Sequence, residues 1–469
     1  MADICIIYAR SDASAIPPAL EAVLKTRWSV WWDRHLVSGD YRAGIEAEVT
    51  ACEVLIPIWS TAATFNAHMH DELEIARKAG VAILPVRIHA ADAPMSYGSL
   101  QATEMLGWDG KETLPQLNSL MGRVRAAIEE RRPDERPQRL AMNGFVDLPA
   151  FFYSVSSHET RLAPAAALRT LDMFGAETIL VSAYDTGPNA PKSLIQTLER
   201  RRKRGATILL DSGNYERARR DDGDWKFETF ETALRATPHD LAFAFDVLNP
   251  TGDIDKVAKA AIAAAKRTAR LTTAPVIPIV HLPRRPDDSY RTEMAGPVMR
   301  HVAQALAPAM IAIPERELGS GVFERARTMS IIRKALKGLG RYQPVHVLGA
   351  GNPISLALLS AAGADCFDGL EWCRYAFDAE HAQLHHFQLF ELFSYQLAVA
   401  ESPVAASAAL DPAVSYTTKA VMHNLDFYNT WLKELRSAAQ EEKALVAFLA
   451  GLLPKGAIAQ ARAALPSVL

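Results

Sequence analysis

Short apolar runs alternate with amphipathic segments of helical spacing along this chain of 469 residues. Near the start, the runs that we expect as strands are ICIIYA, SVWWD, VLIPIW and VAILPVRI. Strands that alternate with helices build parallel sheets with helices on both faces. The pattern predicts an α/β domain at the beginning of the chain.

The same alternation continues over a longer stretch further along. The strand-like runs there are ETILVSA, ATILLDSG, DLAFAFD, APVIPIVHL, AMIAIPE, PVHVLGAG and ADCFDGLEW. About seven or eight β-α units in roughly 250 residues predict a TIM barrel, whose active site lies at the C-terminal ends of the strands. Asp211, Asp246 and Asp368 each follow such a run. The segment from about 380 onward has helical spacing.

A charged, proline-containing stretch around residues 124–142 separates the two patterns and is the best linker candidate. We therefore expect a first domain over 1–130, a linker over 131–144, and a (β/α)8 barrel with a C-terminal helical part over 145–469. The length itself favours roughly two to four domains.

Composition excludes several classes of protein. With 49% hydrophobic residues, 22% charged residues and a net charge of −3, the chain is ordinary for a globular protein and has no global basic field. The four cysteines are widely spaced, without a CxxC, as in a reducing compartment. The start resembles no signal peptide, and no apolar stretch reaches bilayer-spanning length. We expect a cytoplasmic protein without a membrane partner.

The segment FNAHMHDELEIARK (65–78) places Asp71, Glu72 and Glu74 where a helix is expected to start. Acidic residues in a first helical turn complement the macrodipole, which needs no function. The alternative is that one of the three faces a pocket and does chemistry.

Four stretches support the second alternative for one of these residues. They are DICIIYARSDA (3–13), WSVWWDRHLVSGDYRAGI (28–45), ACEVLIPIWS (51–60) and DELEIA (71–76). Their order and spacing resemble those of toll/interleukin-1 receptor (TIR) domains, over roughly residues 1–130 and in the bacterial form. The resemblance implies a flavodoxin-like fold and, as in many members, cleavage of NAD⁺ as a substrate with release of nicotinamide.

The resemblance also assigns site residues. Glu72, in the pattern E-L-x-x-A, matches the essential glutamate, which would orient the ribose hydroxyls and stabilise an oxocarbenium-like transition state. Tyr8, Arg10 and Ser60 match boxes that line the cofactor cleft. Asp71 and Glu74 would remain solvated on the helix.

One departure lies four residues before the glutamate, where NAD-cleaving relatives often have tryptophan and this chain has His68. His68 is the corresponding cofactor-binding candidate. We expect core packing for the nearby Trp31, Trp32 and Trp59. The loop from Leu36 to Tyr41 resembles the one through which TIR domains assemble.

A second resemblance covers about 145–445. The stretches LLDSGNYE (209–216), AFAFDVLNP (242–250), HVLGAGNP (346–353), DCFDGLEWCR (365–374) and VMHNLDFYNTWLKEL (421–435) fall in the order of tRNA-guanine transglycosylases. Those enzymes carry DSGGFQ, AFDE, MGVGTP, DMFDCVLPTR and THNLxFY at these places. A barrel aspartate of that family attacks the ribose carbon and expels guanine. The family is commonly dimeric, so we expect a homo-oligomer.

By position, Asp368 would be the nucleophile and Asp211 a general acid/base or base-recognition group. Asp246 would hydrogen-bond the purine edge, and Arg374 matches an arginine that binds the nucleic-acid backbone. His281 occupies the place of a base-reading glutamine. Without a functional role, three strand-end aspartates would simply cap the following loops.

The barrel departs from that family at its metal site and at its recognition loops. Transglycosylases bind zinc through a CxCxxC run and the histidine of the HNL stretch; His423 is present, but no cysteine follows Cys373. We therefore expect no zinc. A glycine pair that contacts the base is replaced around Pro314 and Glu315, so ordinary tRNA-guanine exchange is not expected.

Three hypotheses follow. The first is an NAD⁺-cleaving TIR effector of bacterial antiphage defence, controlled by a barrel that senses a nucleobase, a nucleotide or nucleic acid. In the second, the barrel exchanges a base in RNA or DNA and the TIR domain is an assembly module. In the third, both halves are binding scaffolds without chemistry. The carboxylates kept at the matching positions count against this third hypothesis.

Overall fold

The computed structural model describes residues 2–25, 28–33, 41–91, 93, 97–111, 115–131, 135–158, 160–187 and 190–466. The chain divides into two compact units, residues 1–136 with 340–342 and residues 137–339 with 343–469. No helix in the described part of the chain is long and apolar enough to span a bilayer.

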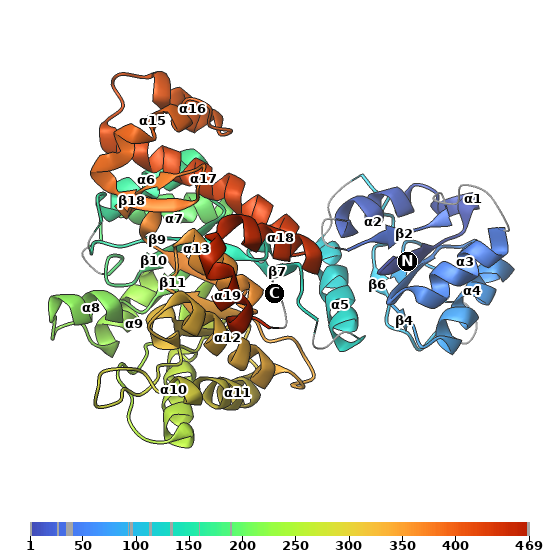
Figure 1. Ribbon diagram of the computed structural model, residues 1–469. Coiled ribbons are helices and arrows are strands. Elements are labelled where there is room, and N and C mark those ends of the chain that lie inside the picture. The colour runs from blue at the N-terminus through green and yellow to red at the C-terminus, as the bar shows by residue number, and fades with distance from the viewer. Residues whose placement is uncertain are drawn as a thin grey trace. The chain divides into compact units, whose positions relative to one another are not determined.

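The first unit is built on a parallel sheet with the strand order β2-β1-β3-β5-β6, in which β4 also pairs with β3 (Figure 1). Its strands are β1 (Ile4–Ile7), β2 (Val30–Trp31), β3 (Val54–Trp59), β4 (Ala82–Ile83), β5 (Val86–Arg87) and β6 (Thr103–Glu104). Pro85 separates β4 from β5 because it has no N–H for the sheet. With β4 and β5 counted as one interrupted strand, the order is the flavodoxin-like one, as predicted.

The helices of this unit are α1 (Arg10–Ala13), α2 (Ile16–Leu24), α3 (Tyr41–Ala51), the 3₁₀ helix η2 (Ala63–Phe65), α4 (Ala67–Lys78) and α5 (Pro115–Arg131). The helices α3 and α4 contact each other and share one core cluster with the sheet. Val49 of α3 and Leu73 of α4 are fully buried in this cluster. Burial of these side chains fixes which face of α4 points away from the sheet.

The helix α4 starts earlier than we expected. Asn66 caps it, and its Oδ1 accepts hydrogen bonds from the backbone N–H groups of His68 and Met69 at 3.0 and 3.3 Å. The first turn from Ala67 holds no acidic residue, so the three carboxylates that begin at Asp71 lie one turn further on. The expectation that they complement the helix end was wrong, because an asparagine cap already satisfies that end.

The second unit contains a near-closed barrel of parallel strands in the order β13-β12-β11-β10-β9-β16-β15-β14, and a bridge between Ile279 and Ala312 joins the two edges. The strands are β9 (Ala150–Val155), β10 (Thr178–Ser182), β11 (Thr207–Asp211), β12 (Leu241–Phe243), β13 (Val276–Ile277), β14 (Ile311–Pro314), β15 (Val345–Leu348) and β16 (Cys366–Gly369). Seven of them coincide with predicted runs, and β9 is an addition. The predicted TIM barrel is confirmed.

Helices follow the strands around the barrel (Figure 1). They are α6 (Pro164–Phe174), α7 (Lys192–Lys203), α8 (Asn214–Arg220), α9 (Phe227–Ala236), α10 (Ile254–Thr268), α11 (Ala295–Leu306), α12 (Val322–Leu336), α13 (Pro353–Ala361), α14 (Glu371–Arg374) and α17 (Tyr416–Ala438). The long α17 contacts α6 and α14 and fills the place after the last strand. The predicted C-terminal helical part also includes α15 (Ser394–Leu397), α16 (Pro403–Leu410), α18 (Glu442–Leu452) and α19 (Ile458–Ala464).

The N-terminal end of the barrel is covered by an antiparallel hairpin. Its strands are β7 (Arg139–Met142) and β8 (Gly144–Asp147), so part of the segment expected as a linker forms a strand. Val146 and Leu148 belong to the cluster that fills the barrel interior. The opposite, C-terminal end is therefore the one open to a ligand.

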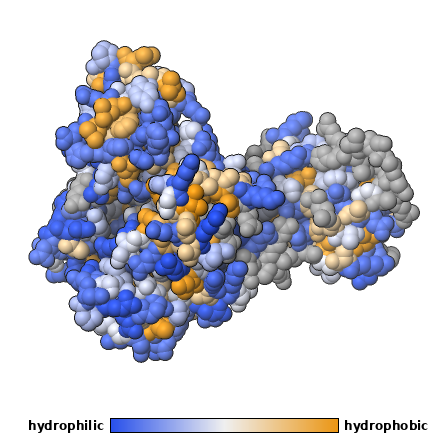
Figure 2. All heavy atoms as spheres, in the orientation of Figure 1, coloured by the Kyte–Doolittle hydropathy of each residue, from blue (hydrophilic) through white to orange (hydrophobic). Residues whose placement is uncertain are grey.

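Apolar side chains are exposed on the segment from the 3₁₀ helix η5 (Phe387–Leu392) to α16. Leu392 is 64% exposed, Val399 81% and Leu410 83%. Figure 2 shows apolar (orange) atoms at the top of the view, over the region that Figure 1 labels α15 and α16. Exposed apolar groups that gather on one element are typical of interaction surfaces.

Candidate functional site

Glu72 lies in the second turn of α4 and is partly buried. Burial raises the pKa of its carboxyl group to about 7, and the negative charges of Asp33 and Asp71 add to this effect. Its neighbour Glu74 is in a different state: Arg77 donates two hydrogen bonds to it, at 2.8 and 2.6 Å, and lowers its pKa to about 2. Glu72 is therefore able to hold or release a proton near neutral pH, and Glu74 is a surface ion pair.

The other residues predicted for the cleft of the first unit follow the ends of β1 and β3. The Tyr8 hydroxyl donates to Asp33 at 3.0 Å, and Arg10 Nε donates to the same carboxylate at 2.7 Å. Ser60 is fully buried and donates to Asp12 at 2.6 Å. Sequence reasoning missed the two aspartates, although WWD and ARSD place both directly after predicted strands.

The three tryptophans of the first unit lie in the core, as expected, whereas the cofactor-binding candidate His68 lies at the surface. Trp31, Trp32 and Trp59 are buried, and His68 is exposed on α4. Phe65, directly before the Asn66 cap, is 87% exposed and was not singled out from the sequence. The loop predicted for assembly, with Ser38-Gly39-Asp40, lies outside the described residues.

The five residues predicted for the barrel line one cavity of about 310 Å³ at the C-terminal ends of the strands. They are Asp211, Asp246, His281, Asp368 and Arg374. Residues after different strands meet at this end because all strands of the barrel point the same way. The cavity also contains carboxyl groups that sequence reasoning missed, namely those of Glu216, Glu315 and Glu371.

Asp368, on β16, is held by three donors. Ser154 Oγ donates to its Oδ2 at 3.2 Å, while His346 Nε2 and the Gly349 N–H donate to its Oδ1 at 2.9 and 3.3 Å. His346 is fully buried, and its Nδ1 has no hydrogen-bond partner among the described residues. Since a buried unpaired N–H would be costly, Nε2 is the ring nitrogen that donates to Asp368. The carboxylate is thus oriented by hydrogen bonds.

Asp211 ends β11 on another wall of the cavity. Burial raises its pKa well above the usual value, and the charge of Glu216 adds to the shift. Ser156 Oγ donates to Glu216 Oε1 at 2.5 Å, and Glu216 Oε2 finds no partner in the described part of the chain. A carboxyl group with a raised pKa holds its proton more tightly than an ordinary aspartate, so Asp211 is a candidate general acid.

Asp246 and His281 form an ionic network with Glu317, which lies in the 3₁₀ helix η4 (Glu315–Leu318). The two ring nitrogens of His281 lie 2.7 Å from Asp246 Oδ2 and 2.7 Å from Glu317 Oε1. Burial opposes the charge of the imidazolium, but these two carboxylates raise the pKa of His281 to about 10. Asp246 also accepts hydrogen bonds from Ser212 and Asn214 at 2.8 and 2.9 Å. Burial would raise the pKa of Asp246, yet its donors, His281 first, lower it.

The residues present do not fit the zinc site of the transglycosylases. His423 is buried and donates its Nε2 proton to the Phe377 carbonyl at 2.9 Å, and burial lowers its pKa. Cys373 is also buried, with its Sγ 3.3 Å from the Leu370 carbonyl. No further cysteine follows it in the sequence. A zinc ion would need thiolates that this region does not supply.

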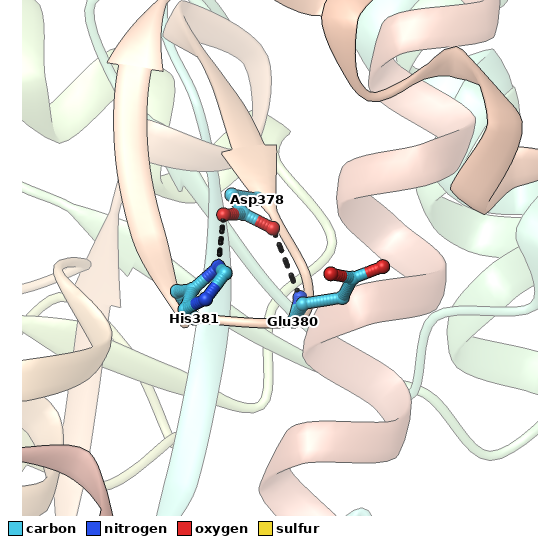
Figure 3. A group of neighbouring side chains, drawn as sticks. All are labelled: Asp378, Glu380 and His381. Atoms are coloured by element: carbon cyan, nitrogen blue, oxygen red, sulfur yellow. Dashed lines mark hydrogen bonds and ion pairs between the residues drawn. The ribbon is translucent and has the colours of Figure 1, made fainter.

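Asp378, Glu380 and His381 are the one group among the described residues whose side chains could hold a metal ion together (Figure 3). His381 Nδ1 lies 2.6 Å from Asp378 Oδ2, and Gln396 and the Glu380 N–H donate to Oδ1 at 2.9 and 3.0 Å. In Figure 3 the Glu380 carboxylate points away from the other two side chains. These contacts link β17 (Tyr375–Asp378) to the turn that follows it.

Comparison with known proteins finds a family match for the first unit and similar proteins for the C-terminal region. Residues 4–118 match the family model described as TIR domain. The tRNA-guanine(15) transglycosylase of Haloarcula marismortui is 25% identical over 268 residues, which are 53% of this chain and 51% of the relative. That of Haloferax volcanii is 26% identical over 263 residues, 53% of this chain and 48% of the relative. The chain spans about half the length of these relatives. Residues 4–118 therefore form a TIR domain, and the C-terminal region is similar to tRNA-guanine transglycosylases.

Proposed function

We propose that the TIR domain cleaves the nicotinamide–ribose bond of NAD⁺ with Glu72 as the catalytic carboxyl group. The observation that carries the proposal is the state of Glu72: a partly buried carboxyl with a pKa of about 7 on α4. Such a group can hydrogen-bond the ribose hydroxyls and stabilise positive charge that develops at the anomeric carbon. Tyr8, Arg10, Ser60 and His68 are the proposed cofactor-binding residues.

The test is nicotinamide release from NAD⁺ by the concentrated full-length protein. We expect Glu72→Ala to abolish release, a loss of about 1,000-fold or more if the carboxyl stabilises the transition state. Glu74→Ala is the matched control, because it removes an exposed carboxylate two residues away on the same helix. Parental release by a folded Glu72→Ala variant would sink the proposal.

We further propose that the barrel senses a nucleobase, a nucleotide or a nucleic acid and controls the TIR domain, in bacterial antiphage defence. The support is the cavity of about 310 Å³, which is large enough for a base and lined by buried polar groups. Assembly into a homo-oligomer is part of the proposal, and the exposed Leu392 and Val399 offer apolar surface for it. Addition of guanine should raise the melting temperature of the parent, and less so that of Asp246→Ala.

A second function is favoured by one specific observation. Asp368 is oriented by three hydrogen-bond donors in the same cavity as Asp211, whose pKa is raised by burial. A fixed carboxylate beside a proton donor is the arrangement for covalent attack on an N-glycosidic bond. We propose as the alternative that the barrel acts on such a bond in RNA or DNA. Covalent trapping of nucleic acid by the parent, lost in Asp368→Ala, is its test.

A further inference from the structure

Glu371 is a carboxyl group in the barrel cavity that the transglycosylase stretch does not have. DCFDGLEWCR here aligns with DMFDCVLPTR, so Glu371 stands at a leucine position and Gly369 at a cysteine position. A Cβ built on Gly369 would lie 2.2 Å from Glu371 Oε2, and one on Gly351 2.0 Å from it. The carboxylate therefore fits only because both positions are glycine. The two replacements in the stretch act together to admit an acid beside Asp368.

The environment of Glu371 leaves this acid available for chemistry. The residue lines the cavity together with Asp368, and its Oε2 has no hydrogen-bond partner among the described residues. Burial raises the pKa of Glu371 to about 7, and the charges of Glu315 and Asp368 oppose its ionisation further. A buried acceptor without a partner is costly unless a ligand or water meets it. Glu371 is thus a titratable acid in the lining of the same cavity as Asp368.

The groups that could capture a replacement base are already in use. Asp246 accepts hydrogen bonds from Ser212, Asn214 and His281. Both ring nitrogens of His281 are bonded to carboxylates, so the ring has no N–H left for a base. A replacement base would have to compete with these internal hydrogen bonds to be held by Asp246 or His281, whereas water would not.

We propose that the barrel hydrolyses the N-glycosidic bond of a nucleobase in a nucleic acid, with Glu371 activating the water that releases the sugar from Asp368. This inference rests on the second proposed function, the attack of Asp368 on such a bond. It differs from base exchange in the acceptor, which is water.

The proposed reaction has two steps, and its atoms and protons balance over them. In the first, an Asp368 oxygen bonds to the anomeric carbon, the carbon–nitrogen bond breaks, and the leaving base takes the Asp211 proton. In the second, the ionised Glu371 takes a proton from water, the water oxygen bonds to the anomeric carbon, and the carbon–oxygen bond to Asp368 breaks. The proton on Glu371 returns to Asp211 through solvent. One water is consumed, and the products are a free base and an abasic sugar.

The experiment uses the full-length protein and a tRNA transcript with tritium-labelled guanine, without added free base. Free guanine, abasic sites and covalent adduct on a denaturing gel are measured. We expect the parent to release guanine and leave abasic sites. Glu371→Gln should slow release by about 100-fold, as expected for loss of a general base, and accumulate the adduct. Asp368→Asn should form no adduct. Parental release should increase as pH rises through 7, because Glu371 acts in its ionised form.

Two further variants serve as controls for the role of Glu371. Glu391→Gln, an exposed glutamate on η5, should behave as the parent. Gly369→Ala should reproduce the slow release, because its Cβ displaces the Glu371 carboxylate. Adduct formation with unchanged release in Glu371→Gln, or release that requires added free base, would overturn this inference and leave the attack by Asp368 intact. Absence of both adduct and release in the parent would overturn both.

Discussion

Glu72 in the TIR domain and the acidic residues of the barrel cavity are all withdrawn from solvent, but their charges are balanced in different ways. Burial raises the pKa of Glu72, and the charges that add to this shift, those of Asp33 and Asp71, are both negative. Asp246 in the barrel is matched by the imidazolium of His281, and Asp368 accepts three hydrogen bonds. The first carboxyl remains titratable near neutral pH, whereas Asp246 stays ionised.

The difference shows two ways in which a fold tunes an acid. Burial without a hydrogen-bond partner among the described residues shifts the pKa of Glu72 at a cost in stability, which a functional site tolerates. Burial with partners keeps Asp246 charged, but makes the barrel depend on each member of the network. Substitutions at the two sites should therefore have opposite effects on stability.

The largest effect is expected for His281→Ala. Removal of the imidazolium leaves Asp246 and Glu317 buried without the cation between them, which should destabilise the barrel by about 3–5 kcal/mol. Urea unfolding of the full-length protein measures the change. The double variant Asp246→Asn/His281→Ala should lose less than the sum of the single changes, because one uncompensated charge is gone. Equal midpoints for His281→Ala and the parent would contradict the ionic network.

Glu72→Gln should have the opposite sign and depend on pH. The folded-state pKa of about 7 lies above the ordinary value of 4.5, so the folded protein binds the proton more tightly than the unfolded chain. Stability of the parent is then lost as pH rises from about 4.5 to about 7, by up to about 3 kcal/mol. Glutamine carries no such penalty. Unfolding at pH 5 and pH 8 should show a gain for Glu72→Gln mainly at pH 8, and an equal gain at both would contradict the shifted pKa.

Asn66→Ala should have the smallest effect of the three. It removes the side-chain cap of α4 and should cost about 1 kcal/mol. Asn66→Asp keeps an acceptor at the same place and is the control. If both variants unfold at the parental urea concentration, the cap does not stabilise the helix that carries Glu72.

The sequence predicted the two folds because apolar runs and helical spacing recur regularly in both units. Its errors were local. Pro85 split one predicted strand, AFFYSV was passed over as β9, and the Asn66 cap moved the start of α4. The last error matters most, because the helix start decides which carboxylates complement the helix end and which do not.

From the residue pattern alone, the barrel site could be predicted only where a strand run ends in an acid; His281 and Arg374 were predicted from the resemblance to transglycosylases. Asp211, Asp246 and Asp368 follow β-strand runs, and the barrel topology brings such ends together. His346 lies inside the strand β15 and Glu317 in the 3₁₀ helix η4, so no local pattern marks either as a partner of these acids. Their roles depend on distances between residues far apart in the sequence, which spacing along the chain does not encode.

The hairpin of β7 and β8 has a kinetic consequence. Because it covers the N-terminal end of the barrel, a ligand must enter and leave through the same mouth. A base released deeper in the barrel than the bound sugar could then leave only after the sugar has moved. The two products, base and sugar, would therefore leave in a fixed order. The residence time of a ligand in the barrel would then depend on the loops around its open, C-terminal end.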